Sequence, residues 1–450
     1  MRLSTSEANG FAADAPAVSS RFTSASDRWS SRTDTALLAS ALFMQRFVLP
    51  FPGTKSVSLC ILPVMLILGY QFAANRLWVQ YDRLPWFLLL ALSATISLLS
   101  NLNSSRTSYG LFLVGYFFFT LIRPSSQDQY RRTLHSFQCL VFFVSCLAIL
   151  QFPAQLVMDP QKLIMFFGIF PDAFLPYKGR VNTMGIISAA GQLVKSNGIF
   201  LAEASTLSQI AAIAILIEVI EFRRLWYLIV LSSGFLVAYS GTGASILLVS
   251  FPLAFLVTRK AQLAVLLVCL FAAALFAMDI IHLSAFTQRL DEFQETQASG
   301  FERFVSPFWM AGDYLNRASL SELLFGNGLG HIYVPRGYYN ASAGTWFKLV
   351  FEYGLVGAFV LAWFLRLCFR RSWCPAPVIV GIVYNYLFTG NNLLDPAGLT
   401  IMVVLCTLRP GPILEALPLG KRQRHSVIER TSRASVALYR RSRTPRDRGM

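Results

Sequence analysis

Charged residues are scarce in this sequence. Asp, Glu, Lys and Arg make up 14% of its 450 residues, whereas a soluble globular domain carries about a quarter. A cysteine framework is also missing, because the seven cysteines form no Cys-x-x-Cys pair and none lies in the two long polar loops described below. These absences exclude an ordinary soluble domain, a disulfide-stapled exterior and a cysteine zinc site. The first 34 residues lack an apolar core followed by a small-residue cleavage site, so no signal peptide is predicted.

Apolar residues are abundant instead. They form 55% of the chain and gather into continuous runs of roughly 14 to 24 residues, where one spanning helix needs about 20. We therefore predict an all-α polytopic membrane protein with about ten to twelve transmembrane helices and a large extracytoplasmic loop containing amphipathic helices. The expected spans are 35–49, 57–73, 85–100, 109–122, 136–157, 198–220, 225–239, 242–258, 261–280, 346–369, 376–390 and 396–408.

The placement of Lys and Arg predicts which side each loop faces. With the N-terminus inside, the inner connections hold twelve basic residues, while the short outer loops hold Lys55 and Arg106. This distribution follows the positive-inside tendency of membrane proteins. Both termini are then cytoplasmic, and residues 158–197 and 279–345 form two long extracytoplasmic loops of a transmembrane domain that covers residues 35–408.

Both ends of the chain are polar. Residues 1–34, rich in Ser and Ala, are predicted to be a disordered cytoplasmic N-terminus. Residues 409–450 form a basic cytoplasmic tail with eleven Lys and Arg against three Asp and Glu, a net charge of +8 and half of the +16 of the chain. A basic tail is compatible with nucleic acid. Its position after the last span favours anionic lipid headgroups or fixing of the topology, so we predict no nucleic-acid partner.

Basic residues in the long outer loops run against the positive-inside tendency, so each needs an acidic partner or an anionic ligand. Arg303 and Arg336 lie in the second loop, and Arg180 and Lys195 lie in the first. A guanidinium binds phosphate in a bidentate manner and stays charged at any working pH. The structural alternative is pairing with acidic residues of the second loop, namely Asp291, Glu292, Glu295, Glu302 or Asp313.

Glu203 is a candidate functional residue. It is expected about one turn inside the sixth span, and an intramembrane carboxylate is costly enough to be a functional candidate by default. The alternative is a structural carboxylate satisfied by Ser205 and Ser208. Glu352, expected two turns inside the tenth span, is assigned a structural role in which it hydrogen-bonds across the bundle to Tyr or Asn.

His331 is a candidate general base or phosphate-binding residue. It follows the turn "GNGLG" at 326–330, in which glycine lets the backbone turn sharply, although a simple flexible loop is the alternative. A histidine near arginines can act as a general base or donate to a phosphate, or it can be an ordinary surface residue. Ser-His-Asp spacing, His-x-x-x-His, a Walker loop and an outward Asp pair are all lacking, so neither a metal nor a cofactor is predicted.

Four segments between Asn197 and Gly390 together resemble the O-antigen ligase and O-antigen polymerase-like superfamily of bacterial envelope glycan enzymes. They are "NGIFLAEASTLSQIAAIAIL", "AYSGTGASILLVSFPLAFL", "SGFERFVSPFWMAGDYLNRASLSELLFGNGLG" and "TWFKLVFEYGLVGAFVLAWFL". They are similar in turn to the family's Gly-Phe-x-Glu-Pro-Ser stretch, its Ser-rich helix start, its Arg-containing amphipathic segment and its Glu-x-Gly-Leu-Ile-Gly helix. The chain differs at Lys195 and at 241–243, where the family often has Arg, and at 344–345, where it often has His-Asn.

The resemblance implies transfer of a lipid-linked glycan outside the bacterial cytoplasmic (inner) membrane. We expect a metal-independent glycosyltransferase that polymerises undecaprenyl-diphosphate-linked repeat units in exopolysaccharide or O-antigen biosynthesis. Membrane lipids, a chain-length regulator and other exopolysaccharide assembly proteins are the implied partners. The alternatives are an O-antigen ligase-type transfer to a lipid or protein, a non-enzymatic polysaccharide transporter or flippase, and a structural membrane protein.

The resemblance also assigns roles to the candidate residues. Arg303 and Arg336 would hold the diphosphate, with Lys195 or Arg180 assisting from the first loop. A lipid diphosphate is a good leaving group, so the enzyme mainly needs cations to stabilise it and a base for the acceptor hydroxyl. The base would be either His331 or Glu203.

Overall fold

The computed structural model describes residues 20–49, 57–101, 104–123, 125–155, 157, 183–188, 191–258, 299–330, 332, 344–370, 372–390 and 392–409. The expected span 261–280, the candidates Arg180, His331 and Arg336, and the tail beyond 409 lie outside these residues.

Within the described residues the chain is mostly helical. The helices are α1 (Ser20–Phe43), α2 (Ile61–Ala73), α3 (Leu84–Ser100), α4 (Arg106–Phe117), α5 (Gln127–Ala154), α7 (Ala204–Ile217), α8 (Leu225–Val237), α9 (Gly241–Thr258), α12 (Ser299–Phe304), α13 (Ser306–Arg317), α14 (Leu320–Phe325), α15 (Thr345–Phe369), α16 (Ala376–Phe388) and α17 (Pro396–Met402). Two π-helices, η3 (Glu218–Phe222) and η5 (Val403–Thr407), extend α7 and α17. Short antiparallel pairs join β1 (Val48–Leu49) to β2 (Val57–Ser58), β3 (Trp78–Val79) to β4 (Leu121–Ile122), and β5 (Thr183–Ser188) to β6 (Gly191–Val194).

Helix length and composition support a membrane protein. In the part of the chain that the structure describes, three helical stretches are long and apolar enough to cross a membrane: α5, α7 with its π-helical extension, and α15. Several shorter apolar helices accompany them, α2, α3, α8 and α9 among these. Large apolar side chains on these four are exposed, including Leu66, Leu99, Leu225 and Leu248. An apolar exterior of this kind is what membrane lipid covers. The number of crossings and the side of each terminus stay predictions.

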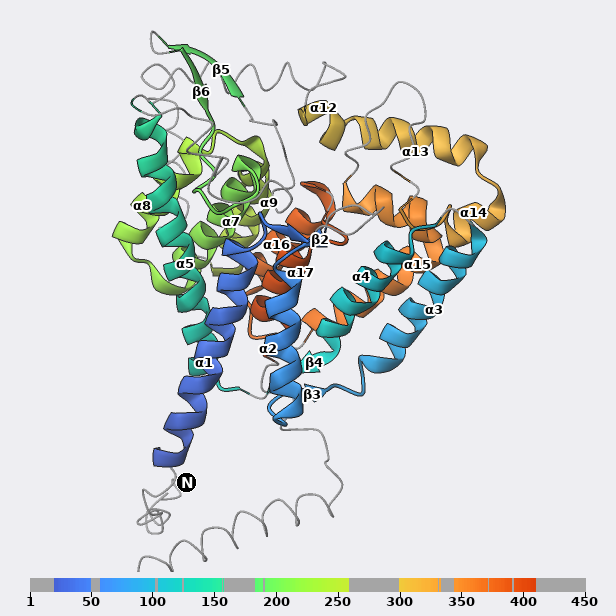
Figure 1. Ribbon diagram of the computed structural model, residues 1–450, viewed down its shortest axis with the longest axis horizontal. Coiled ribbons are helices and arrows are strands. Elements are labelled where there is room, and N and C mark those ends of the chain that lie inside the picture. Colours follow the sequence, from blue (N-terminus) through green and yellow to red (C-terminus); the bar gives the residue numbers. More distant parts are fainter. Residues whose placement is uncertain are drawn as a thin grey trace, which may run out of the picture.

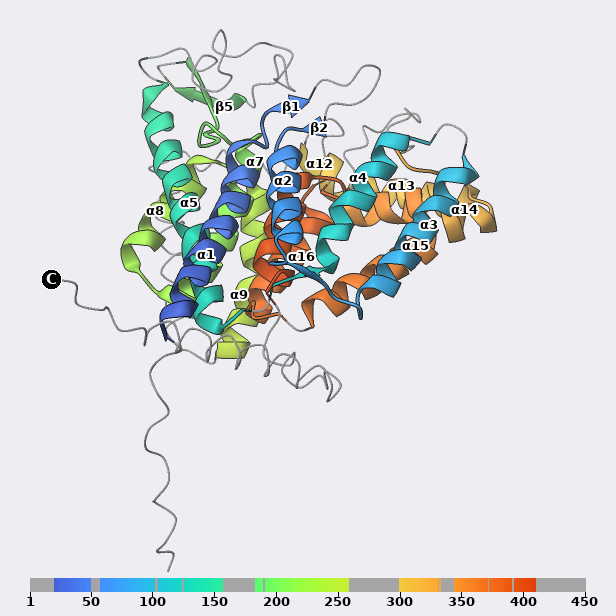
Figure 2. The ribbon, with the colours of Figure 1, turned by 60° about the horizontal axis from the view of Figure 1, so that its bottom comes forward.

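The elements form two packed groups, as Figures 1 and 2 show. In one group α1 packs on α5, α5 on α8, and α7 on α9, which in turn packs on α16. In the other, α15 packs on α3 and on α14. Helices α12 and α13 lie across one end of the molecule, the end that also carries β5 and β6 and lies opposite the start of α1 (Figure 1). We call this the loop end.

Residues 299–325, which belong to the loop expected to contain amphipathic helices, form three short helices. The chain breaks at Val305 and again at Ala318 and Ser319, because the side chain of Ser319 starts α14 by accepting from the backbone N–H of Glu322. Helix α13 buries Tyr314 against Phe347 and Phe351 of α15. Its exposed residues are both polar and apolar, with Phe308, Trp309 and Leu315 among the apolar ones, so the amphipathic character of this loop stays a prediction.

The glycine turn that follows α14 is packed tightly against α15. Gly326 and Gly354 have positive φ values of 85° and 70°. A Cβ at Gly326 would clash with the carbonyl oxygen of Glu352, and one at Gly354 would clash with that of Leu324. The N–H of Asn327 donates to Phe351 O at 2.9 Å. The turn is thus a fixed contact between two helices, and the flexible-loop alternative does not describe it.

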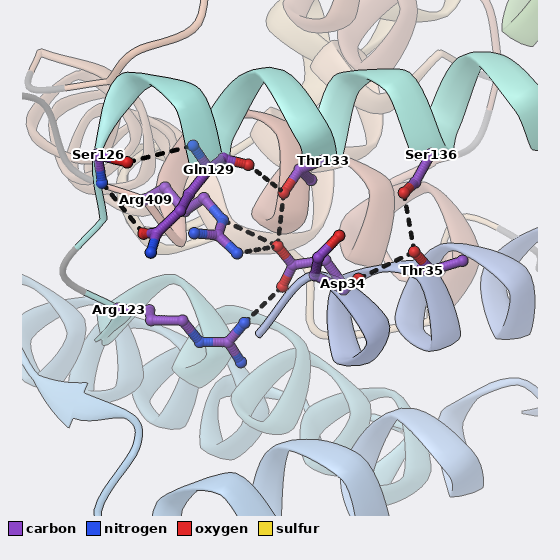
Figure 3. A network of polar contacts seen from close by, with 9 residues as sticks. Asp34, Thr35, Arg123, Ser126, Gln129, Thr133, Ser136 and Arg409 are labelled. Carbon is purple, nitrogen blue, oxygen red and sulfur yellow. Dashed lines mark hydrogen bonds and ion pairs between the residues drawn. The ribbon is translucent and has the colours of Figure 1, made fainter. Parts of the chain in front are cut away.

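A buried ion cluster joins α1 to two distant parts of the chain (Figure 3). Asp34 is fully buried and accepts from Arg123 at 2.6 Å, from Thr133 at 2.6 Å and from Nε of Arg409 at 2.8 Å. Arg123 follows β4, Thr133 lies on α5 and Arg409 follows η5. Asp34 is the last residue of the segment 1–34, so α1 begins inside the stretch that was predicted to be disordered.

Candidate functional site

Two of the predicted site residues meet in the structure. Nη2 of Arg303, on α12, lies 3.4 Å from Oε2 of Glu203 although the two residues are 100 positions apart. Their side chains are 19% and 37% exposed. Among the described residues the partner of Arg303 is therefore the candidate base. Of the loop acids named as the structural alternative, Asp291, Glu292 and Glu295 lie outside the described residues, so pairing with them is not tested. Arg303 belongs to α12, one of the helices at the loop end (Figure 1).

Glu203 occupies a different position from the one expected. It is the N-cap residue of α7, with an extended backbone at φ −142°, and not a residue one turn inside the span. The correction has a local cause, because Gly198 and Ile199 both have positive φ, at 67° and 69°, which a helix cannot accommodate. The helix therefore begins at Ala204, and the carboxylate stands at its open end.

The surroundings leave part of the carboxylate free. Ser205 Oγ donates to Oε2 of Glu203 at 2.8 Å, so this expected partner is confirmed. Ser208, the other expected partner, donates instead to the backbone oxygen of Ser205 at 2.9 Å. Within the described part of the chain, Oε1 of Glu203 accepts no hydrogen bond. A half-exposed carboxylate with one engaged oxygen and one open oxygen can accept a hydrogen bond from an incoming hydroxyl.

Hydrogen-bonded hydroxyl groups join the start of α9 to α7, the helix whose N-cap residue is Glu203. Ser208 Oγ lies 3.2 Å from Thr242 Oγ1 and accepts from the N–H of Gly243 at 3.2 Å. Ser240 Oγ lies 2.9 Å from the same Thr242 oxygen. A Cβ at Gly243 would clash with the backbone of Ser208, so the Gly-Thr-Gly sequence permits the close approach of two helices. Thr242 and Gly243 therefore have a packing role in this chain, whereas a Cβ at Gly241 would meet no neighbour.

Lys195 is the remaining predicted phosphate-binding residue that lies in the described part of the chain. It is half-buried in the segment that joins β6 to α7, next to Ser196, whose N–H donates to Val237 O at 3.2 Å at the end of α8. Among the described contacts none joins Lys195 to Arg303 or Glu203. Its predicted role, like those of the candidates outside the described residues, stays a prediction.

Arg46 is a residue of this region that the sequence did not single out. It was counted within the first expected span, but α1 ends at Phe43 and Arg46 lies in the turn that follows. Its Nη1 donates to Ile199 O at 2.6 Å, and only 5% of the residue is exposed. Burial lowers the pKa of Arg46 to about 10, so the guanidinium remains charged at neutral pH. A basic residue at this end of an expected span, against the positive-inside tendency, was the signal that could have found it.

Two residues that the sequence marked near α15 have structural surroundings. Thr345, where the resembled family often has Asn, donates to Gly390 O at 3.1 Å and accepts from the N–H of Asn392 at 2.9 Å. Glu352 is fully buried, and its backbone oxygen accepts from Ser97 Oγ. The expected hydrogen bond of the Glu352 carboxylate to Tyr or Asn across the bundle stays a prediction.

Metal ligation is not apparent in the described residues, which contain no group of three or more His, Cys, Asp or Glu side chains arranged around a common point. No protein-family model matches the chain, and no curated protein is similar to it. What the composition and the helices define is a class, a helical membrane protein. The pair of Glu203 and Arg303 at its loop end is the geometry from which a particular function can be argued.

Proposed function

We propose that this protein is a glycosyltransferase of the polysaccharide polymerase type, which acts on a lipid-diphosphate-linked glycan at the outer face of the cytoplasmic membrane. The observation that carries the proposal is the contact of 3.4 Å between Arg303 and Glu203 at the loop end. A guanidinium that can stabilise a leaving diphosphate thereby stands beside a carboxylate that can receive the proton of an acceptor hydroxyl.

The proposed reaction needs only these two kinds of group. The acceptor oxygen attacks the anomeric carbon, and the bond from that carbon to the diphosphate oxygen breaks. The electron pair leaves with the lipid diphosphate, whose added negative charge Arg303 stabilises. The hydroxyl proton passes to Oε1 of Glu203, the oxygen that accepts no hydrogen bond from the described residues. In the resting protein Arg303 contacts Glu203, and the diphosphate takes the place of Glu203 on the guanidinium when the donor binds.

Replacement of Arg303 tests this proposal. Arg303→Ala is expected to reduce long polymer by roughly a hundred- to a thousand-fold, the usual cost of losing a donor to a developing oxyanion. Arg303→Lys keeps the charge but loses the bidentate geometry, so we expect an intermediate loss. The measurement is glycan chain length in cells, normalised to the amount of folded protein.

Arg317→Ala is the matched control, because Arg317 lies in the same loop at the exposed end of α13. It is expected to retain normal polymer. Normal long polymer from Arg303→Ala at normal abundance would overturn the assignment. Accumulation of single lipid-linked repeat units in a deletion strain supports a polymerase, whereas accumulation of finished but unattached polymer supports the ligase alternative.

One observation favours a different class, the transporter. Lys348 and Glu352 lie one turn apart on α15, and both are buried, at 2% and 0% exposure. Buried ionisable residues inside a span are typical of transport pathways. The discriminating experiment replaces Glu352 with Gln and measures whether lipid-linked repeat units still reach the outer face. Trapping of these units on the inner face favours the transporter, and their accumulation on the outer face favours the polymerase.

A further inference from the structure

The segment 194–203 begins at the last residue of β6 and continues as irregular, partly buried backbone to the start of α7. Ser196, Asn197 and Leu201 are between 0% and 3% exposed. Buried backbone of this kind persists only when its polar groups are hydrogen-bonded, because an unpaired buried N–H or C=O is costly. Several of its hydrogen-bond partners are side chains from elsewhere in the chain, namely Gln151, Gln155 and Arg46. Glu203 is the last residue of this segment, so whatever fixes the segment also fixes the carboxylate.

Two buried glutamines at the end of α5, Gln151 in its last turn and Gln155 directly after it, pair with the beginning of the segment. Gln155 forms a two-way pairing with Val194, donating to its carbonyl at 2.8 Å and accepting from its N–H at 2.7 Å. One turn earlier, Oε1 of Gln151 accepts from the N–H groups of Asn197 and Gly198 at 3.1 and 3.0 Å. The Gln151 Nε2 donates to Asn197 Oδ1 at 3.0 Å. Each amide side chain therefore replaces the partners that a strand or helix would have supplied.

The middle of the segment adopts a left-handed conformation that needs this support. Ile199, a β-branched residue, has φ 69°, which costs energy unless the surroundings impose it. Asn197 Oδ1 accepts from the N–H of Ile199 at 3.0 Å, and the amide nitrogen of Asn197 donates to Leu201 O at 2.9 Å. Arg46 donates to the carbonyl of Ile199 at 2.6 Å. Asn197 and Arg46 thus hold the N–H and the carbonyl of the strained residue, and Gln151 of α5 in turn holds Asn197.

We propose that Gln151, Asn197 and Arg46 are positioning residues, which hold the segment 194–203 in its left-handed turn so that Glu203 faces Arg303. This inference rests on the proposed function for its consequence in activity, while its structural part stands on the hydrogen bonds alone. Gln151→Leu removes three hydrogen bonds to the segment at once and leaves both site residues in place.

The structural part is tested by hydrogen–deuterium exchange of the full-length protein in lipid nanodiscs. In Gln151→Leu the amides of residues 194–203 are expected to exchange at least about ten times faster, while those of α7 beyond its first turn remain unchanged. The matched control is Gln138→Leu. Gln138 is also a buried glutamine on α5 and donates to Ala214 O at 2.8 Å on α7, away from the segment. It is expected to leave the exchange of residues 194–203 unchanged.

The functional part is tested by a double-mutant cycle on polymer formed per folded protein. Gln151→Leu alone is expected to reduce polymer by roughly ten- to a hundred-fold, because small misplacements of a reacting group are that costly. In the background of Glu203→Gln, the same change is expected to add less than about a two-fold loss, because it acts through Glu203. Gln138→Leu is expected to leave polymer per folded protein unchanged in both backgrounds.

The outcomes separate this inference from the proposed function. Unchanged exchange at residues 194–203 in Gln151→Leu overturns the structural part. Losses that multiply in the double variant, or full activity in Gln151→Leu beside a defective Glu203→Gln, overturn the positioning role and leave the proposed function intact. Full activity in Glu203→Gln overturns the proposed role of the carboxylate in the reaction. The same result also overturns the catalytic consequence of positioning Glu203.

Discussion

Removal of the Asp34 carboxylate is expected to lower the free energy of unfolding strongly. Asp34 and Arg409 are 0% and 1% exposed in their side chains, and Arg123 is 6% exposed. Asp34→Ala leaves two buried guanidinium groups close together without the carboxylate between them. Breaking a buried pair by removing one partner costs about 3–5 kcal/mol, because the remaining charge is uncompensated. With two cations affected, we expect Asp34→Ala to reach at least the upper part of that range.

The assay is reversible unfolding of the purified protein in mixed micelles, from which the free energy of unfolding is obtained for each variant. Asp34→Asn keeps the shape of the side chain and one carbonyl oxygen, so it is expected to lose less than Asp34→Ala. Asp313→Ala is the matched control, because Asp313 is an exposed acid on α13 and its loss is expected to change stability by less than about 0.5 kcal/mol.

A compensated variant completes the test. Replacing Asp34 with Leu and both Arg123 and Arg409 with Met removes the three charges of this cluster. Replacing a buried ion cluster by apolar residues often leaves stability unchanged. We therefore expect this triple variant to be more stable than Asp34→Ala. The reasoning would be refuted if Asp34→Ala lost less than about 1 kcal/mol, or if the triple variant were the less stable of the two.

Three further predictions concern contacts that hold the helices together. Gly354→Ala forces a side chain onto a residue at φ 70° and into the carbonyl of Leu324, so we expect a loss of about 2 kcal/mol or more in unfolding free energy, and no loss would contradict the close packing. Arg83 donates to the carbonyls of Phe119, Thr407 and Cys368, so Arg83→Met is expected to cost several kcal/mol and to lower the yield of folded protein. Thr345→Val removes the hydroxyl that joins α15 to the segment 390–392 and is expected to cost about 1–3 kcal/mol, with faster amide exchange at Asn392.

Local patterns predicted the helices better than the site. The long apolar runs located α5, α7 and α15, because a membrane-length run is a property of consecutive residues. The pairing of Arg303 with Glu203 depends on packing across 100 residues, which no local pattern contains. The start of α7 was placed too early because the left-handed turn at Ile199 is imposed by side chains of α5 and of the turn after α1.

Asp34 illustrates the same limit. Its neighbours in sequence are polar, so the stretch was interpreted as a disordered lead-in, although its partners Arg123 and Arg409 lie 89 and 375 residues away. The glycine turn at 326–330 was the more informative signal. Three glycines in five residues predicted an unusual backbone, and all three have positive φ in the structure.

The Asp34 cluster also sets an order for biogenesis. During synthesis Asp34 emerges early, Arg123 follows, and Arg409 is made only after η5, the last helix that the structure describes. Until Arg409 has been synthesised, Asp34 lacks the second of its two basic partners, and α1 cannot complete its packing against η5. The cluster therefore closes only on a chain that has been translated through its last described helix. A prematurely stopped chain retains an incomplete charge cluster, which is the kind of defect that membrane quality-control proteases can recognise.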